Sequence, residues 1–258
     1  MTQPTSAAHN TPKARLIYGF HPVLSKLRRD PESILELFIA ETRHDPRSRE
    51  ALTLAQSLGV RLHLLTTERL DAMVGTRRHQ GIVARIDGRR RDLKLVDVLE
   101  TLTEPALILV LDGVQDPHNL GACLRVADAA GAHAVVAPKD RAAPLNATAE
   151  KVASGAADTI PYITVTNLAR SLREMQEASV WVLGAAGEAE KDIYQTEQTA
   201  SIAWVLGAEG EGLRHLTRQT CDQLVRIPMY GSVESLNVSV ASGICLFEAR
   251  RQRCLVSV

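Results

Sequence analysis

The sequence has 258 residues, 45% of them apolar, and its 30 Lys or Arg balance 30 Asp or Glu. A chain of this size can bury a substantial core in one or two domains. No apolar run approaches the roughly 20 residues that span a bilayer, and the N-terminus lacks the hydrophobic centre of a signal peptide, so we expect a cytoplasmic protein. The four cysteines form no Cys-x-x-Cys pair, which argues against a metal site or a disulfide framework.

Positive charge is concentrated in the N-terminal part of the chain. Residues 1–100 contain 17 Lys or Arg and 12 Asp or Glu, whereas residues 101–258 contain 13 and 18. This asymmetry suggests that the N-terminal part meets a polyanion, although a solvated charged surface is the alternative. Aromatic residues make up only 3% of the chain, which argues against base stacking on an aromatic platform as the main mode of recognition.

Hydrophobic periodicity divides the chain into two α/β domains. Residues 1–15 are typical of a disordered arm, residues 16–87 predict a small domain, residues 88–104 a charged linker, and residues 105–258 a larger domain. In the small domain the pattern predicts helices at 21–27, 46–58 and 67–74 and strands at 35–40, 60–65 and 81–86.

The larger domain repeats the alternation with longer units. The pattern predicts strands at 107–112, 133–137, 160–165, 180–184, 202–207 and 224–228, and helices at 122–130, 167–178, 213–221 and 236–253. Strands that alternate with helices indicate a mostly parallel sheet, with ligands expected beyond the carboxyl ends of the strands.

Two of these strand ends carry unusual polar chemistry. Asn119 and Arg125 lie around a helix start, where an Asn can cap the helix and an Arg can present its planar fork to a phosphate or an oxyanion. Three glycines follow strand 202–207, and glycine lets a ligand approach the main chain closely. Glu209 and Glu211 would repel a pyrophosphate there. A capping Asn with a surface Arg, and a tight glycine turn, are the alternatives.

The third block, residues 227–243, carries the densest polar run. It places five polar residues between an apolar strand and an apolar helix: Ser232, Glu234, Ser235, Asn237 and Ser239. A well-capped helix is one interpretation, since small polar side chains bond the free N–H groups of a first turn. So many polar groups beside a Gly and a Pro favour a binding site.

Together the blocks NLGACLR at 119–125, VLGAEGEGLR at 205–214 and IPMYGSVESLNVSVASG at 227–243 closely resemble the SpoU, or TrmH-like, ribose 2'-O-methyltransferases of the SPOUT superfamily. The resemblance continues through YGFH at 18–21 and HQG at 79–81 and covers about residues 16–253. It implies an L30e-like N-terminal domain that holds RNA, a C-terminal α/β domain with a deep trefoil knot, S-adenosyl-L-methionine bound among the knotted loops, and a homodimer.

At this extent the resemblance implies methyl transfer to the ribose 2'-OH of a guanosine in the peptidyl-transferase P-site loop of 23S rRNA, free or in a ribosome assembly intermediate. Such a transfer needs a positioned hydroxyl that loses its proton, and no metal. A tRNA methyltransferase of the same family and a non-catalytic rRNA-binding assembly factor are alternatives. A nucleotide-dependent oxidoreductase or ligase is a third, but its glycine fingerprint is missing.

Site residues follow from the same comparison. Gly207, Ile227 and Leu236 should line the cofactor pocket. Arg125 takes the central catalytic role, and the residues that shape its surroundings are Asn119, Glu209, Ser235 and Asn237. From their charge alone, the RNA phosphate contacts are expected at Arg77, Arg78, His79, Arg89, Arg90 and Arg91, with solvated loops as the alternative.

Overall fold

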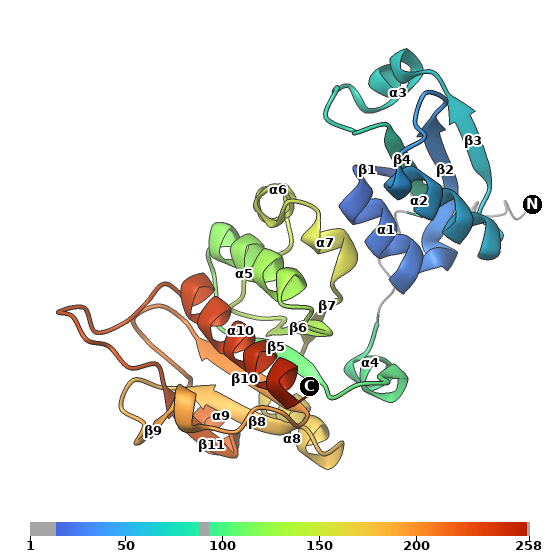
Figure 1. Cartoon of the computed structure of the whole chain (residues 1–258). Helices are drawn as coiled ribbons and strands as arrows, with labels where there is room; N and C mark the ends of the chain where they lie inside the picture. The colour runs from blue at the N-terminus through green and yellow to red at the C-terminus, as the bar shows by residue number, and fades with distance from the viewer. Residues whose placement is uncertain (1–13, 88–92, 257–258) are drawn as a thin grey trace, which may run out of the picture. The chain divides into compact units, whose positions relative to one another are not determined.

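The structure, a computed structural model, describes residues 14–87 and 93–256, with the side chain of Arg29 left out. The chain forms two compact units, with the boundary between residues 91 and 92 (Figure 1). Almost all of the predicted arm and the first part of the predicted linker lie outside the described residues.

The N-terminal unit is a four-stranded sheet with helices on both faces. The strand order is β1-β4-β2-β3, in which only β2 and β3 run parallel. The strands are β1 (Arg15–Tyr18), β2 (Ile34–Ala40), β3 (Leu62–Leu65) and β4 (Ile82–Ile86), and the helices are α1 (Phe20–Arg29), α2 (Pro46–Ser57), α3 (Thr67–Val74) and the 3-10 turn η1 (Pro31–Ser33). Because β1 has only four residues, its own pattern did not predict it; pairing with β4 defines it, and Arg15 belongs to this strand and not to the arm.

The C-terminal unit is a seven-stranded sheet in which every paired strand is parallel. Its order is β7-β6-β5-β10-β8-β11-β9. The strands are β5 (Leu107–Asp112), β6 (Ala134–Pro138), β7 (Tyr162–Val165), β8 (Trp181–Ala185), β9 (Lys191–Asp192), β10 (Ile202–Gly207) and β11 (Gln223–Arg226). The helices are α4 (Leu95–Thr101), α5 (Pro117–Ala129), α6 (Ala147–Ala153), α7 (Ala156–Thr159), α8 (Leu168–Glu177), α9 (His215–Thr220), α10 (Val238–Val256) and the 3-10 turn η2 (Ile193–Gln195).

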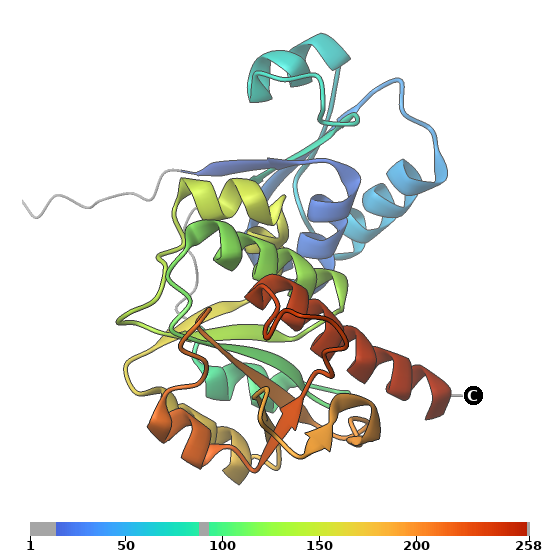
Figure 2. The same cartoon turned by 90° about the vertical axis from the view of Figure 1, so that its left-hand side faces the viewer.

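Side chains of the central strands point alternately to two apolar layers. Leu109 and Trp204 face a layer with the buried residues of α5, α6 and α10, whereas Val110 and Val205 face a layer with α4 and α8. Figure 2 shows α5 and α10 side by side on one face of the sheet. Strands buried on both faces read as continuous apolar runs, which is why the sequence predicted the central strands well.

Two helical predictions need correction. Helix α5 begins at Pro117, five residues before the predicted start, because Asp116 caps it by accepting from the His118 N–H at 2.9 Å. Asn119 therefore lies inside the first turn and is not the cap. Helices α6 and α7 were not predicted, since seven and four residues are too few for a helical period to show.

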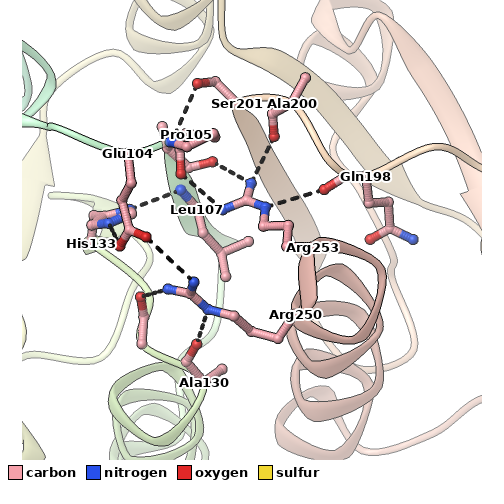
Figure 3. Close-up of polar contacts among 12 residues, drawn as sticks. Glu104, Pro105, Leu107, Ala130, His133, Gln198, Ala200, Ser201, Arg250 and Arg253 are labelled. Atoms are coloured by element: carbon pink, nitrogen blue, oxygen red, sulfur yellow. Dashed lines mark hydrogen bonds and ion pairs between the residues drawn. The ribbon is translucent and has the colours of Figure 1, made fainter. Parts of the chain in front are cut away.

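Polar side chains join α10 to the amino-terminal edge of the parallel sheet (Figure 3). The Arg253 guanidinium donates to the carbonyls of Pro105, Ala106, Gln198 and Ala200 at 2.7–3.2 Å. It thereby ties the end of the helix to the chain just before β5 and β10.

Arg250 and His133 make a second set of contacts at this edge (Figure 3). Arg250 donates to the carbonyls of Ala130 and Gly131 at 2.6 and 2.5 Å and lies 3.7 Å from Glu104. His133 accepts the Leu107 N–H at its Nδ1, so its Nε2 carries the proton and donates to Glu104 at 2.9 Å. Burial lowers the pKa of His133, although the bond to Glu104 opposes this shift.

No described helix is long and apolar enough to cross a membrane. Within residues 14–87 and 93–256, no group of three or more His, Cys, Asp or Glu side chains is arranged to hold a metal ion.

Candidate functional site

The three polar blocks converge at the carboxyl edge of the parallel sheet. Strands β5 and β10 are paired along their full length and end together at Asp112 and Gly207. The chain after β5 enters α5, and the segment after β11 enters α10, which packs beside α5. Parallel strands bring together at one edge residues that are more than 100 positions apart in sequence.

One hydrogen bond joins the first block to the third. The Asn237 side chain donates from Nδ2 to Asn119 Oδ1 at 2.9 Å. Its own Oδ1 accepts the backbone N–H of Ser239 at 2.9 Å and the Ser239 hydroxyl at 2.6 Å. Both the nitrogen and the oxygen of the Asn237 side-chain amide are therefore engaged. Asn119 uses only its oxygen, and its amide nitrogen has no partner in the described part of the chain. Asn237 directly precedes α10 and caps it, whereas Ser239 lies inside the first turn and donates to that cap, so the prediction of Ser239 as a cap is corrected.

An ion pair joins the end of β5, which precedes the first block, to the second block. Asp112, 1% exposed, accepts from Arg214 through the backbone N–H at 2.9 Å and through Nε at 2.5 Å, and the Arg214 Nη2 is also paired with it. A buried carboxylate needs such partners, because an unpaired buried charge is costly. We did not single out this pair from the sequence, although an acid that ends an otherwise apolar strand was an available signal.

The loop after β10 folds back tightly on Gly207. Gly212 donates its N–H to the Ala208 carbonyl at 3.0 Å, which closes a five-residue turn that exposes Glu209 and Glu211. A Cβ atom at Gly207 would overlap the backbone of Gly212 and Leu213. Gly207 is thus required by close packing of main chain against main chain, and the strand end stays bare of side chain.

Three of the predicted catalytic side chains are exposed and unpaired. Arg125 projects from α5, Glu209 from the glycine loop and Ser235 from the segment before α10. None of the three has a side-chain hydrogen bond or ion pair with any residue in the described ranges. In the same domain, Arg214, Arg250 and Arg253 are engaged by protein groups. Charged groups that the fold leaves unused are available to a ligand.

Apolar groups lie next to these polar ones. Ile227 is half-buried and packs against the α5–α10 layer, and Leu236 is half-buried immediately before Asn237. Cys123 on α5 lies 3.5 Å from the Ser242 hydroxyl of α10. Burial raises the pKa of its thiol to about 11, so Cys123 stays protonated at neutral pH and acts as a small core residue.

The predicted RNA contacts in the N-terminal unit separate into two kinds. Arg77 and Arg78 are exposed, whereas His79 is only 2% exposed and its Nε2 lies 2.7 Å from Asp71. Its Nδ1 accepts the Gly81 N–H at 3.0 Å. The prediction of His79 as a direct contact is therefore corrected, because its ring is buried and both ring nitrogens bond protein groups that hold the turn. The predicted contacts at residues 89–91 lie outside the described residues.

Sequence profiles of two families match the two units of the chain. The SpoU rRNA Methylase family matches residues 106–247, and the RNA 2'-O ribose methyltransferase substrate binding family matches residues 16–91. The fold and the converging polar blocks thus define an RNA ribose methyltransferase of the SpoU class, and the chain belongs to the SpoU rRNA Methylase family.

Two relatives that match nearly the whole chain share one enzyme name. The chain is 59% identical over 244 residues to the 23S rRNA (guanosine-2'-O-)-methyltransferase RlmB of Ralstonia nicotianae, covering 95% of this chain and 98% of that protein. It is 53% identical to the RlmB of Vibrio vulnificus, covering 92% and 96% of the two chains.

Solved structures share the fold. The SpoU methyltransferase AviRb from Streptomyces viridochromogenes, in complex with its cofactor AdoMet, aligns with a TM-score of 0.64 at 24% identity over 94% of this chain and 91% of that one. The TrmH/SpoU tRNA modifying enzyme of A. aeolicus aligns with a TM-score of 0.55 at 30% identity over 62% and 81% of the two chains.

Proposed function

We propose that this protein transfers a methyl group from S-adenosyl-L-methionine to the ribose 2'-OH of a guanosine in 23S rRNA. The observation that carries the proposal is the hydrogen bond from Asn237 to Asn119, on the helix that also carries the unpaired Arg125, because it unites two distant polar blocks at the sheet edge where ligands bind. Relatives named for this reaction at 59% and 53% identity support the choice of substrate.

Gly207, Ile227 and Leu236 are proposed to hold the cofactor. The bare main chain at Gly207 and two half-buried apolar side chains suit a ligand with an adenine, a ribose and few polar contacts. Bound there, the cofactor supplies the electrophilic methyl group. The trefoil knot implied by the family resemblance stays a prediction.

Arg125 is proposed as the catalytic residue. Loss of the 2'-hydroxyl proton to solvent would place negative charge on the ribose oxygen, and this charge would be consumed as the oxygen takes the methyl group and the sulfonium becomes a neutral thioether. An arginine keeps its proton at neutral pH, so it acts better as a stabiliser of the emerging alkoxide and of the RNA phosphate than as a base. The free amide nitrogen of Asn119 would donate to the same substrate, and the hydrogen bond from Asn237 would fix its orientation.

Glu209 and Ser235 complete the proposed surroundings of Arg125. Both are exposed and lie in the loops after β10 and β11. They are available to orient the sugar by hydrogen bonds, since neither carboxylate nor hydroxyl is engaged within the described residues.

The two units are proposed to divide the work. Residues 16–87 would hold the RNA through Arg77 and Arg78, and residues 105–258 would carry out the transfer. Counterion release then predicts that RNA affinity falls steeply with salt. The basic residues 89–91 in the predicted linker remain proposed contacts.

A homodimer is proposed as the working form. Val240 and Phe247 on α10 are each 51% exposed and seven residues apart, so they lie on one face of the helix. A Phe247→Glu variant should sediment as a monomer, whereas an Arg173→Glu variant, changed on the exposed surface of α8, should keep the dimer.

Mapping of ribose methylation in total RNA from cells with and without the gene tests the substrate. Loss of one guanosine mark in 23S rRNA is expected, and its position tests the P-site loop. Loss of a tRNA mark with 23S rRNA unchanged would contradict the proposal in favour of the tRNA alternative. Unchanged marks in both RNAs would favour an assembly factor without catalysis.

A further inference from the structure

Two motifs that are far apart in the sequence of the N-terminal unit meet at a hollow. This hollow is not part of the proposed methyltransferase site. The hollow has a volume of about 430 Å³, within the roughly 300–1,000 Å³ of pockets that take small organic ligands. Its lining residues are Phe20, Arg43, Asp45, Pro46, Arg47 and Gln80. Phe20 and Gln80 belong to the YGFH and HQG motifs, and the Phe20 N–H donates to Gln80 Oε1 at 3.2 Å.

Gln80 is held in an unusual backbone conformation. Its φ of 57° lies in the left-handed region, which a residue with a side chain seldom adopts. The buried His79 maintains the turn by accepting the Gly81 N–H and bonding Asp71. Because the Gln80 oxygen is taken by Phe20, its amide nitrogen is left to donate into the hollow.

Arg43 forms one wall of the hollow. Its guanidinium lies over the buried Phe20 ring, 5.7 Å from the centroid, and donates to Asp45 at 3.1 Å. Gly81 brings the turn against this side chain, since a Cβ there would lie 2.9 Å from Arg43 Cγ. A guanidinium fixed in this way offers a flat cationic surface on which an unstacked base can lie.

The surrounding charge favours a phosphate. The exposed guanidinium of Arg47 has no partner among the described residues, and the exposed Arg77 and Arg78 lie three and two residues before Gln80. The opposing carboxylate of Asp45 is already engaged with Arg43 and with the N–H groups of Arg47 and Ser48. The flat guanidinium of Arg43 can stack against a base, and the free amide nitrogen of Gln80 can donate to the edge of that base. The positive charge at the rim can bind the phosphate.

We propose that this hollow binds a single unpaired nucleotide of the RNA substrate, with the base against Arg43, its edge at Gln80 and its phosphate at Arg47. The proposal rests on the proposed RNA methyltransferase function and deepens it. The N-terminal unit would then recognise an unpaired base in addition to the backbone, using an arginine surface where the chain has few aromatics.

Two RNAs test the proposal on the full chain: a fully paired duplex and the same duplex with one bulged 2-aminopurine nucleotide. Stacking of one base on a flat side chain tightens binding by a factor of about 5–150 in Kd. Anisotropy titrations should therefore show at least about fivefold tighter binding of the bulged RNA, and the 2-aminopurine fluorescence should change on binding.

The variants Arg47→Ala and Gln80→Glu should lose this preference. The Glu carboxylate can still accept from Phe20, so the turn is kept while the donor is removed. Arg49→Ala is the matched control, because Arg49 is exposed on the same helix but does not line the hollow. It should weaken both RNAs equally and keep their ratio. Thermal unfolding of each variant checks that it is folded.

Retention of the bulge preference in both variants, or 2-aminopurine fluorescence unchanged by the protein, would overturn the nucleotide site. Failure of the proposed function looks different, because wild-type protein would then transfer no labelled methyl group from S-adenosylmethionine to 23S rRNA, whatever the bulge preference.

Discussion

The two edges of the parallel sheet differ in how fully the fold engages their arginines. At the amino-terminal edge, Arg253 donates to four carbonyls and Arg250 to two more, so the guanidinium donors are consumed by the fold. At the carboxyl edge, Asp112 and Arg214 are paired, but Arg125, on the helix that begins at this edge, has no protein partner within the described residues. We expect the engaged arginines to contribute to stability and Arg125 to contribute to function.

The largest effect is expected from Arg125→Ala. Removing a group that stabilises developing charge lowers turnover by about 10²–10³, the size seen for oxyanion donors. An assay of methyl transfer to 23S rRNA measures the turnover. S-adenosylhomocysteine binding, measured by calorimetry, and the melting temperature should both be unchanged. Arg125→Lys should recover little, because the planar fork is lost. Loss of S-adenosylhomocysteine binding in Arg125→Ala would move this residue from catalysis to the cofactor site.

Arg253→Ala should lower the stability of the fold, because Arg253 is engaged by the protein. Four carbonyls lose a charged donor, and hydrogen bonds to charged groups contribute about 1.5–3 kcal/mol each before water replaces them. The free energy of unfolding in urea should fall by about 3 kcal/mol, the upper end of the usual range for a single substitution, because several partly buried hydrogen bonds are lost together. Arg173→Ala, an exposed change on α8, is the control and should cost less than about 0.5 kcal/mol. Equal stability of the two variants would contradict the contrast between the edges.

Lowering the pH should destabilise the amino-terminal edge of the sheet through protonation of His133. Its pKa in the folded protein lies below the ordinary histidine value of 6.5, chiefly because of burial. The neutral ring therefore stabilises the fold above pH 6.5, and this contribution is lost as the pH falls through 6.5 toward the folded pKa, because the unfolded chain takes up the proton first. Protonation would also place a hydrogen on Nδ1 against the Leu107 N–H.

A His133→Asn variant isolates this effect, since its side-chain oxygen can accept from Leu107 and does not titrate. Between pH 7 and 5 the melting temperature of the wild type should fall by a few degrees more than that of the variant. The hydrogen bond from His133 lowers the pKa of Glu104, so the contribution of Glu104 is lost only at lower pH, below the ordinary glutamate value of 4.5. Parallel melting curves for the two proteins would exclude His133 as the titrating group.

The smallest effect is expected at Arg77, whose side chain is 93% exposed and 3.6 Å from Asp71. Arg77→Ala should weaken RNA binding only a few fold and lower the slope of log K against log salt by about 0.7–0.9, as one lost phosphate contact requires. Anisotropy titrations at several salt concentrations measure the slope. An unchanged slope would assign Arg77 to the solvated surface.

Much of this protein was readable from its sequence. The strand Leu107–Asp112 was predicted with its observed ends, because residues buried on both faces form an unbroken apolar run. The order of strands and helices defined the mostly parallel sheet, and residue types at the strand ends marked Asn119, Arg125 and Asn237 as candidates. These features are local, since each depends on neighbours within one helix or strand.

Tertiary structure decided the rest, because it depends on groups distant in sequence. The Asn119–Asn237 bond joins residues 118 positions apart, and no local pattern predicts such a pair. The same holds for Asp112 with Arg214, which buries one charge by pairing it with another. His79 and Arg77 look alike as members of a basic run. Only packing against Asp71 and Gly81 made one a buried support and left the other to solvent.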